Sequence, residues 1–183
     1  ILFLFCVAGL HSQTLPDSIE QEIKRRIELE INPSIAIGLL LPSGETAFFN
    51  YGFSDQDGRS QVNEFTLYEI GSITKTFTAT LAENHLKQSD FSKELGSVFE
   101  EVSNPRLKDV SVRALQNHTS GFSRLSNQFS PEDWSNPFKG YSRKKLMEEL
   151  EQVQPDSANR WAYSNFGYGT LGAVIEEKSG QSF

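Results

Sequence analysis

Ser72 is followed three residues later by Lys75, and this pair is the strongest candidate for covalent chemistry in the sequence. Side chains three residues apart on a helix share one face, one turn apart. A lysine amine in that position can accept the hydroxyl proton while the serine attacks a carbonyl carbon. The amide dipoles of a helix N-terminus would favour the developing anion. The spacing therefore predicts an acyl-transfer nucleophile at the start of a helix.

The same Ser-x-x-Lys spacing recurs at Ser142 and Lys145, and two copies are about what the serine and lysine content gives by chance. The setting distinguishes them. Ser142 stands where an N-cap is needed for the next amphipathic helix, and its neighbours are charged. Ser72 lies in an apolar, weakly charged segment. We therefore predict that Ser72 is the nucleophile and Ser142 a helix cap.

A second candidate is Tyr163-Ser164-Asn165, directly before a glycine-rich apolar helix. The Tyr163 phenol can relay a proton to a leaving group, and the Asn165 amide can fix a substrate carbonyl. The alternative is purely structural, with Tyr163 as an aromatic residue at the edge of the core and Asn165 as the N-cap of the helix.

The elements that must position these residues follow from apolar periodicity. Isoleucines at every fourth position predict a helix over residues 19–31, behind the helix-start signal Pro16-Asp17-Ser18. Two strand-like runs follow at 35–41 and 46–53, separated by a Pro-Ser-Gly turn.

Further helices are predicted at 73–86, 111–117 and 143–153, and from residue 166 onward, with residues 122–141 as a long loop. In the helix at 73–86 we expect Ile73, Phe77 and Leu81 to form one buried stripe, with Ala82 and Leu86 beside it. A hairpin followed by several helices indicates an α/β or α+β fold, with an antiparallel sheet and a helical subdomain.

Composition excludes several classes of function. The 183 residues carry 17 basic and 24 acidic side chains, a net charge of −7, which lacks the basic footprint of a nucleic-acid binder. One cysteine and three scattered histidines give neither a disulfide framework nor metal-ligand spacing. We expect no metal, no cofactor and no nucleic-acid partner, and the partner to be a small-molecule or peptide substrate. The oligomeric state is open.

Nine of the first ten residues are apolar, too few to span a bilayer, which needs about 20. We interpret residues 1–13 as a signal peptide lacking its basic start, which predicts export to the periplasm or the medium, with no stable membrane span in the mature chain. The alternative is a buried first strand or helix. Residues 14–183 are then the N-terminal part of a single catalytic domain.

Four segments together resemble the serine β-lactamase and penicillin-binding family, in its class C β-lactamase and D-alanyl-D-alanine carboxypeptidase branch. They are residues 65–79 (FTLYEIGSITKTFTA), 115–121 (LQNHTSG), 163–176 (YSNFGYGTLGAVIE) and the hairpin at 35–53. The resemblance implies that Ser72 is acylated, Lys75 is its proton partner, Tyr163 is a general base or acid, and Asn165 hydrogen-bonds lysine and substrate. The backbone N–H of Ser72 would be one oxyanion donor.

The family's third motif, of Lys-Thr-Gly or His-x-Gly type, lies on a late strand. Lys178-Ser179-Gly180 has similar letters, but lysine followed by glycine is also the usual end of a helix, which we predict here. The C-terminal strands of the fold would then be missing from these 183 residues. We expect this segment alone to leave sheet edges and apolar helix faces uncovered, and to be inactive.

The leading functional hypothesis is an exported serine hydrolase acting on β-lactams, D-amino-acid peptides or small esters. One alternative is a non-catalytic ligand-binding or sensor module that keeps the fold. Another is an unrelated exported α+β domain in which the motifs are accidental, and Tyr163 far from Ser72 would favour it.

Overall fold

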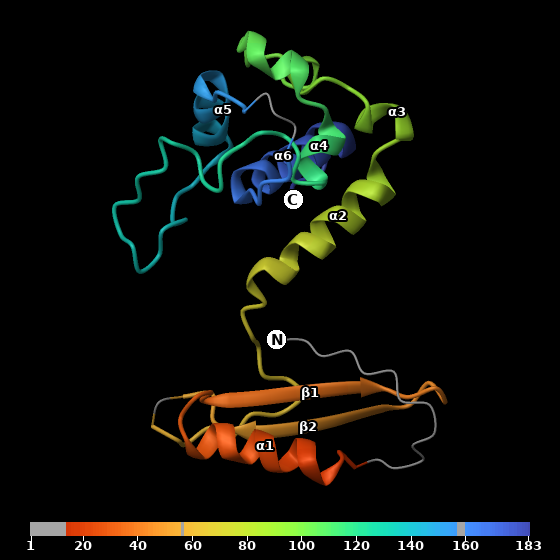
Figure 1. The fold of residues 1–183 in the computed structure, drawn as a ribbon, viewed down its shortest axis with the longest axis vertical. Helices are drawn as coiled ribbons and strands as arrows, with labels where there is room; N and C mark the ends of the chain where they lie inside the picture. Colours follow the sequence, from red (N-terminus) through yellow and green to blue (C-terminus); the bar gives the residue numbers. More distant parts are fainter. Residues whose placement is uncertain (1–13, 56, 157–159) are drawn as a thin grey trace. The chain divides into compact units, whose positions relative to one another are not determined.

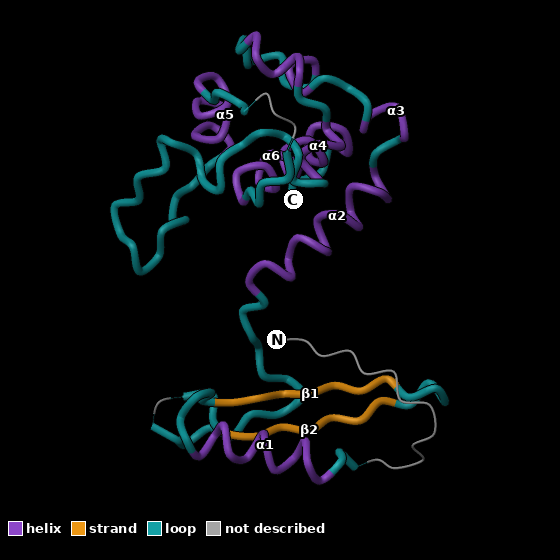
Figure 2. The backbone as a smooth tube through the Cα atoms, in the orientation of Figure 1, coloured by secondary structure: helices purple, strands orange, loops and turns teal. Residues whose placement is uncertain are grey.

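The computed structural model describes residues 14–55, 57–156 and 160–183, so the predicted signal peptide lies outside the described residues. The described residues form two compact units, which divide between Glu69 and Ile70. Each unit is built around its own elements (Figures 1 and 2).

The first unit is a helix packed on a hairpin, as the isoleucine spacing and the strand-like runs predict. Helix α1 (Asp17–Glu28) lies along strands β1 (Ser34–Leu40) and β2 (Thr46–Gly52) and buries Ile23 (Figure 1). The strands pair antiparallel, with Ile37 opposite Phe49.

The second unit is helical and contains all four candidate site residues. A short 3₁₀ turn, η1 (Gly71–Ile73), leads into the helix that the sequence predicts. The helices in chain order are α2 (Thr74–His85), α3 (Gln88–Phe91), α4 (Val112–Gln116), α5 (Arg143–Gln152) and α6 (Asn165–Ser179), with two further 3₁₀ turns, η2 (Leu95–Ser97) and η3 (Pro105–Asp109). The four helices predicted in this part of the chain are confirmed, within a few residues at their ends.

Helix α6 forms the centre of this unit. Its Leu171, Val174 and Ile175 are buried, and they belong to one apolar cluster with Ala82 of α2 and Leu115 of α4. Gly167 and Gly172 are buried on α6, where an added Cβ atom would lie 3.2 Å from Ser164 Oγ and 3.7 Å from the Phe183 ring respectively. The apolar run after Tyr163 is therefore the core helix of the unit.

The buried face of α2 differs from the predicted one. Thr78, Ala82 and Leu86, spaced every four residues, are buried, whereas Ile73, Phe77 and Leu81 are 38%, 60% and 39% exposed. Small side chains at 78 and 82 allow α2 to pack closely on α6. Apolar periodicity predicts that the stripe with the larger side chains is buried. It therefore fails where the adjacent stripe of small residues contacts the neighbouring helix.

Between α4 and α5 the described chain contains no helix or strand, as predicted, and Figure 2 shows this stretch as a long loop. The Tyr141 hydroxyl anchors its end by donating to Oε2 of the buried Glu149 in α5. The Ser142 hydroxyl accepts from the Lys145 N–H at 3.3 Å, so Ser142 is the N-cap of α5.

Candidate active site

The structure brings the four predicted site residues together. The Tyr163 hydroxyl donates to Ser72 Oγ at 2.6 Å, although 91 residues separate them. Lys75 Nζ donates to Asn165 Oδ1 at 2.7 Å and, more weakly, to Ser72 Oγ at 3.4 Å. Tyr163 far from Ser72 would have favoured the hypothesis of accidental motifs, and the hydrogen bond between the two residues counts against it.

Two packed helices create this arrangement. Ser72 is the middle residue of η1 and Lys75 lies in the first turn of α2, so both side chains emerge on one face at the helix start. Asn165 is the first residue of α6. Because α2 packs against α6, the start of each helix comes within hydrogen-bonding reach of the other.

The structural alternative for Asn165 is wrong. The N-cap of α6 is Ser164, whose fully buried hydroxyl accepts from the Gly167 N–H at 2.8 Å and donates to the Ser123 carbonyl at 2.7 Å. The preceding serine thus satisfies the helix terminus. The Asn165 side chain is left to accept from Lys75.

The electrostatic environment lowers the pKa of the Tyr163 phenol. Partial burial raises the pKa of Tyr163, but hydrogen bonding by Lys75 and Ser72 and the positive charges of Lys75 and Arg124 outweigh it, so the pKa lies below its ordinary value. Lys75 Nζ lies 4.8 Å and the Arg124 guanidinium carbon 5.0 Å from the centroid of the ring. Stabilising the phenolate in this way increases the fraction of molecules in which the Tyr163 oxygen is deprotonated and can accept a proton.

The chemistry open to this cluster is nucleophilic attack by a serine with two proton acceptors in reach. Ser72 is exposed, so a substrate carbonyl can approach Oγ. Its proton can pass to the Tyr163 oxygen or to the Lys75 amine, each of which contacts Oγ. This is the arrangement of an activated nucleophile whose base is oriented by further groups.

A loop following α4 holds the Tyr163 segment in place. The carbonyl of Arg124 accepts from the Asn165 N–H at 2.9 Å, and the carbonyl of Gly121 accepts from the Asp156 N–H at 2.9 Å. His118 contacts the residues on both sides of Tyr163. Sequence reasoning assigned no role to His118; its place within the quoted segment 115–121 was the available signal.

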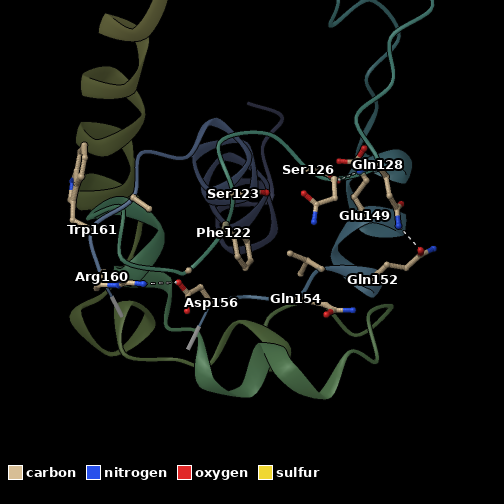
Figure 3. Close-up of a pocket in the computed structure, with 14 residues that line it drawn as sticks. Phe122, Ser123, Ser126, Gln128, Glu149, Gln152, Gln154, Asp156, Arg160 and Trp161 are labelled. Carbon is tan, nitrogen blue, oxygen red and sulfur yellow. Dashed lines mark hydrogen bonds and ion pairs between the residues drawn. The ribbon is translucent and has the colours of Figure 1, made fainter. Parts of the chain in front are cut away.

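A cavity of about 500 Å³ lies beside this loop, whose Gly121, Phe122 and Ser123 line it (Figure 3). Figure 3 shows Phe122 and Ser123 in the middle of the view, Ser126 beside Glu149 and Gln152 of α5 on the right, and Arg160 and Trp161 on the left. Trp161 and Ala162, which directly precede Tyr163, also line the cavity. The side-chain amide of Gln128 donates to that of Gln152 across one edge. The cavity thus shares its wall with the segment that carries Tyr163.

Other predicted features can be placed as well. Gly180, with a φ of 70°, caps the end of α6 and Lys178 lies in its last turn, so Lys178-Ser179-Gly180 is a helix end as predicted. Within the described residues no cluster of three His, Cys, Asp or Glu side chains could hold a metal ion. None of the described helices is long and apolar enough to cross a bilayer.

Comparisons with known proteins identify the family. The family model described as Beta-lactamase matches residues 34–183. A β-lactamase of Providencia stuartii is 32% identical over 169 residues, covering 90% of this chain and 41% of its own length. A β-lactamase of Escherichia coli K12 is 25% identical, covering 97% of this chain and 46% of its own length.

Solved structures agree with this assignment. A class C β-lactamase in complex with cefoxitin superposes with a TM-score of 0.72 at 28% identity, over 91% of this chain and 45% of that one. A β-lactamase/D-alanine carboxypeptidase from Pseudomonas syringae gives 0.67 at 26% identity, over 90% and 45%. The predicted β-lactamase/transpeptidase-like fold is confirmed, and the chain spans a little under half the length of these relatives. With a family model matched over most of its residues, the chain belongs to the Beta-lactamase family.

Proposed function

We propose that this chain carries the nucleophile-bearing part of an exported serine hydrolase that cleaves amide or ester bonds, with β-lactams as the first substrate class to test. The observation that carries the proposal is the contact of Ser72 Oγ with both Tyr163 and Lys75. Because the chain spans less than half of its relatives, the activity of the whole protein is part of the proposal. Export rests on residues 1–13, which lie outside the described residues.

In the proposed reaction Ser72 Oγ bonds to the substrate carbonyl carbon while its proton passes to Tyr163 or Lys75. When the tetrahedral intermediate collapses, the C–N or C–O bond breaks and the leaving group takes that proton. Water then attacks the acyl-enzyme and releases the acid, which restores the Ser72 hydroxyl. Asn165 holds Lys75 in place and can contact the substrate.

An enzyme fits the site better than a non-catalytic binding module. A sensor that had abandoned catalysis would be free to lose one of the proton-transfer groups. Here the nucleophile, both candidate proton acceptors and the amide that orients Lys75 form one hydrogen-bonded cluster. The choice among β-lactams, D-amino-acid peptides and small esters is left to experiment.

The direct test uses the protein expressed from the complete reading frame that contains these residues, called here the complete gene product. It is incubated with a fluorescent penicillin, digested, and the labelled peptide is sequenced by mass spectrometry. The proposal predicts the acyl group on Ser72. Label on another residue, or neither label nor turnover with penicillins, D-alanyl-D-alanine peptides and p-nitrophenyl esters, contradicts it.

Replacing Lys75 by arginine separates charge from proton transfer. Arginine keeps the positive charge near Tyr163 but does not give up its proton in proteins. Loss of one proton-transfer group lowers rates by about 10²–10⁴-fold, and we expect a fall of that size in the rate of Ser72 acylation, followed by stopped-flow fluorescence. The matched control is Lys93→Arg, at a lysine paired with Asp90 in the same unit. A Lys75→Arg protein acylated at the wild-type rate would exclude Lys75 from proton transfer.

A further inference from the structure

His118 occupies a backbone conformation that a histidine seldom adopts. It follows the C-cap of α4 with a φ of 58°, and among the described residues only Glu30 shares a positive φ without being glycine. Glycine, or sometimes asparagine, is the usual residue just after a helix, because other side chains are strained there. A strained residue in such a place suggests that its side chain has a function.

The contacts of His118 surround Tyr163 along the chain. Its carbonyl accepts from the Ala162 N–H at 2.8 Å, and its Nδ1 accepts from the Ser164 N–H at 3.1 Å. One residue therefore holds the backbone immediately before and immediately after Tyr163. The Nδ1 atom can accept only in the neutral imidazole, with the ring proton on Nε2.

The imidazole also packs against aromatic rings of the site. Its centroid lies 4.7 Å from that of Tyr163 and 4.9 Å from that of Tyr168, at interplanar angles of 35° and 39°. Tyr168 is itself fixed, because its hydroxyl donates to the Gln116 carbonyl at 2.9 Å. The ring of Tyr163 thus has a packed neighbour in addition to its held backbone.

We infer that His118 is a positioning residue that sets the place and orientation of the Tyr163 phenol relative to Ser72 Oγ. The inference rests on the proposed role of Tyr163 in proton transfer. It assigns His118 no contact with substrate and no proton transfer of its own. Its effect passes through two backbone hydrogen bonds and one ring contact.

The surroundings of His118 disfavour its charged, imidazolium form. Burial, and then the charge of Lys75 on α2, lower the pKa of His118. The other ionisable groups around it are the phenols of Tyr163 and Tyr168, with Arg124 beyond the Tyr163 ring. As long as the two phenols are protonated, none of these groups carries a negative charge that would favour the imidazolium form of His118.

Two substitutions separate positioning from a merely structural role. His118→Gly keeps the carbonyl and suits the left-handed backbone, but removes the Nδ1 acceptor and the ring. His118→Asn also tolerates that backbone, and its Oδ1 can take the place of Nδ1 as acceptor. Thermal unfolding of both variants of the complete gene product shows whether the fold is kept. In His118→Gly the relief of the left-handed backbone opposes the loss of the hydrogen bond to the Ser164 N–H, so we expect the protein to stay folded with only a small change in unfolding temperature.

The deciding readout is the ionisation of Tyr163, followed by NMR of ¹³Cζ-labelled tyrosine and assigned with Tyr163→Phe. In wild type we expect a titration midpoint below 10, the ordinary value. His118→Gly should move it upward and slow Ser72 acylation about 10-fold, since small misplacements of reacting groups cost such factors. His118→Asn should recover most of both.

An unchanged Tyr163 titration in a folded His118→Gly protein overturns the inference. So does a shifted titration in His118→Gly that remains in His118→Asn when the Asn variant unfolds at the wild-type temperature. The NMR result does not depend on turnover. A shifted titration in a protein that no acyl donor labels would support the positioning role and count against the proposed function alone.

Discussion

Ser72→Ala abolishes covalent labelling by a fluorescent penicillin, and this is the largest effect we expect from a single change. Alanine removes the oxygen that bonds to the acyl carbon, so no acyl-enzyme forms at that position. Turnover of any substrate should fall to the level of residual binding catalysis, a loss on the order of 10⁶-fold for a nucleophile that works as part of a unit. Gel fluorescence and steady-state hydrolysis measure the two losses.

The second Ser-x-x-Lys copy supplies the matched control. Ser142→Ala removes an N-cap from α5 and should lower stability by about 1 kcal/mol, with label at the wild-type level. Equal labelling of wild type and Ser72→Ala would refute the nucleophile assignment. Loss of label in a folded Ser142→Ala protein would show that the two serines had been distinguished wrongly.

Gly121→Ala should unfold or severely destabilise the protein. Gly121 has a φ of 72°, and a Cβ atom there would lie 2.2 Å from the carbonyl oxygen of Asp156 and 2.7 Å from its backbone nitrogen. The two backbones are joined by the Gly121–Asp156 hydrogen bond and cannot separate without breaking it. We expect a loss of about 3–5 kcal/mol in the free energy of unfolding, the range of severe single substitutions.

The control for this prediction is Gly140→Ala. Gly140 has nearly the same φ, 74°, but no atom lies within 4 Å of the added Cβ. Only the left-handed backbone penalty of about 1–2 kcal/mol remains. Chemical denaturation of both variants therefore separates steric overlap from conformational cost, and equal losses would mean that the close approach of Gly121 and Asp156 is absent in solution.

Sequence reasoning found the elements of this chain more readily than the contacts between them. The isoleucine period, the hairpin turn and the helix cap at Ser142 are local signals, and the elements predicted from them are present. The prediction chose the wrong buried face of α2, because the face that is buried depends on which other helix packs against it. Nothing within residues 73–86 specifies that α6 packs on the side of Thr78 and Ala82.

The candidate site was identified by residue type, but its supports were not. Ser72, Lys75, Tyr163 and Asn165 carry recognisable chemistry, so motif and spacing were enough to select them. The structural alternative, with Asn165 as the N-cap, differs by one residue from the observed cap, since Ser164 and Asn165 are equally good caps by type. His118 acts through its carbonyl, its backbone angle and one ring nitrogen, and no spacing rule along the chain encodes those three together.

The distance along the chain between the two halves of the site has a practical consequence. Ser72 and Lys75 come from one helix start and Tyr163 and Asn165 from another about 90 residues later, so neither half can act until α2 and α6 have docked. Under the proposed chemistry, acylation therefore measures the fraction of molecules that are correctly folded. In any preparation, the fraction that takes up the label reports how much of the protein has completed its long-range assembly, independently of total concentration.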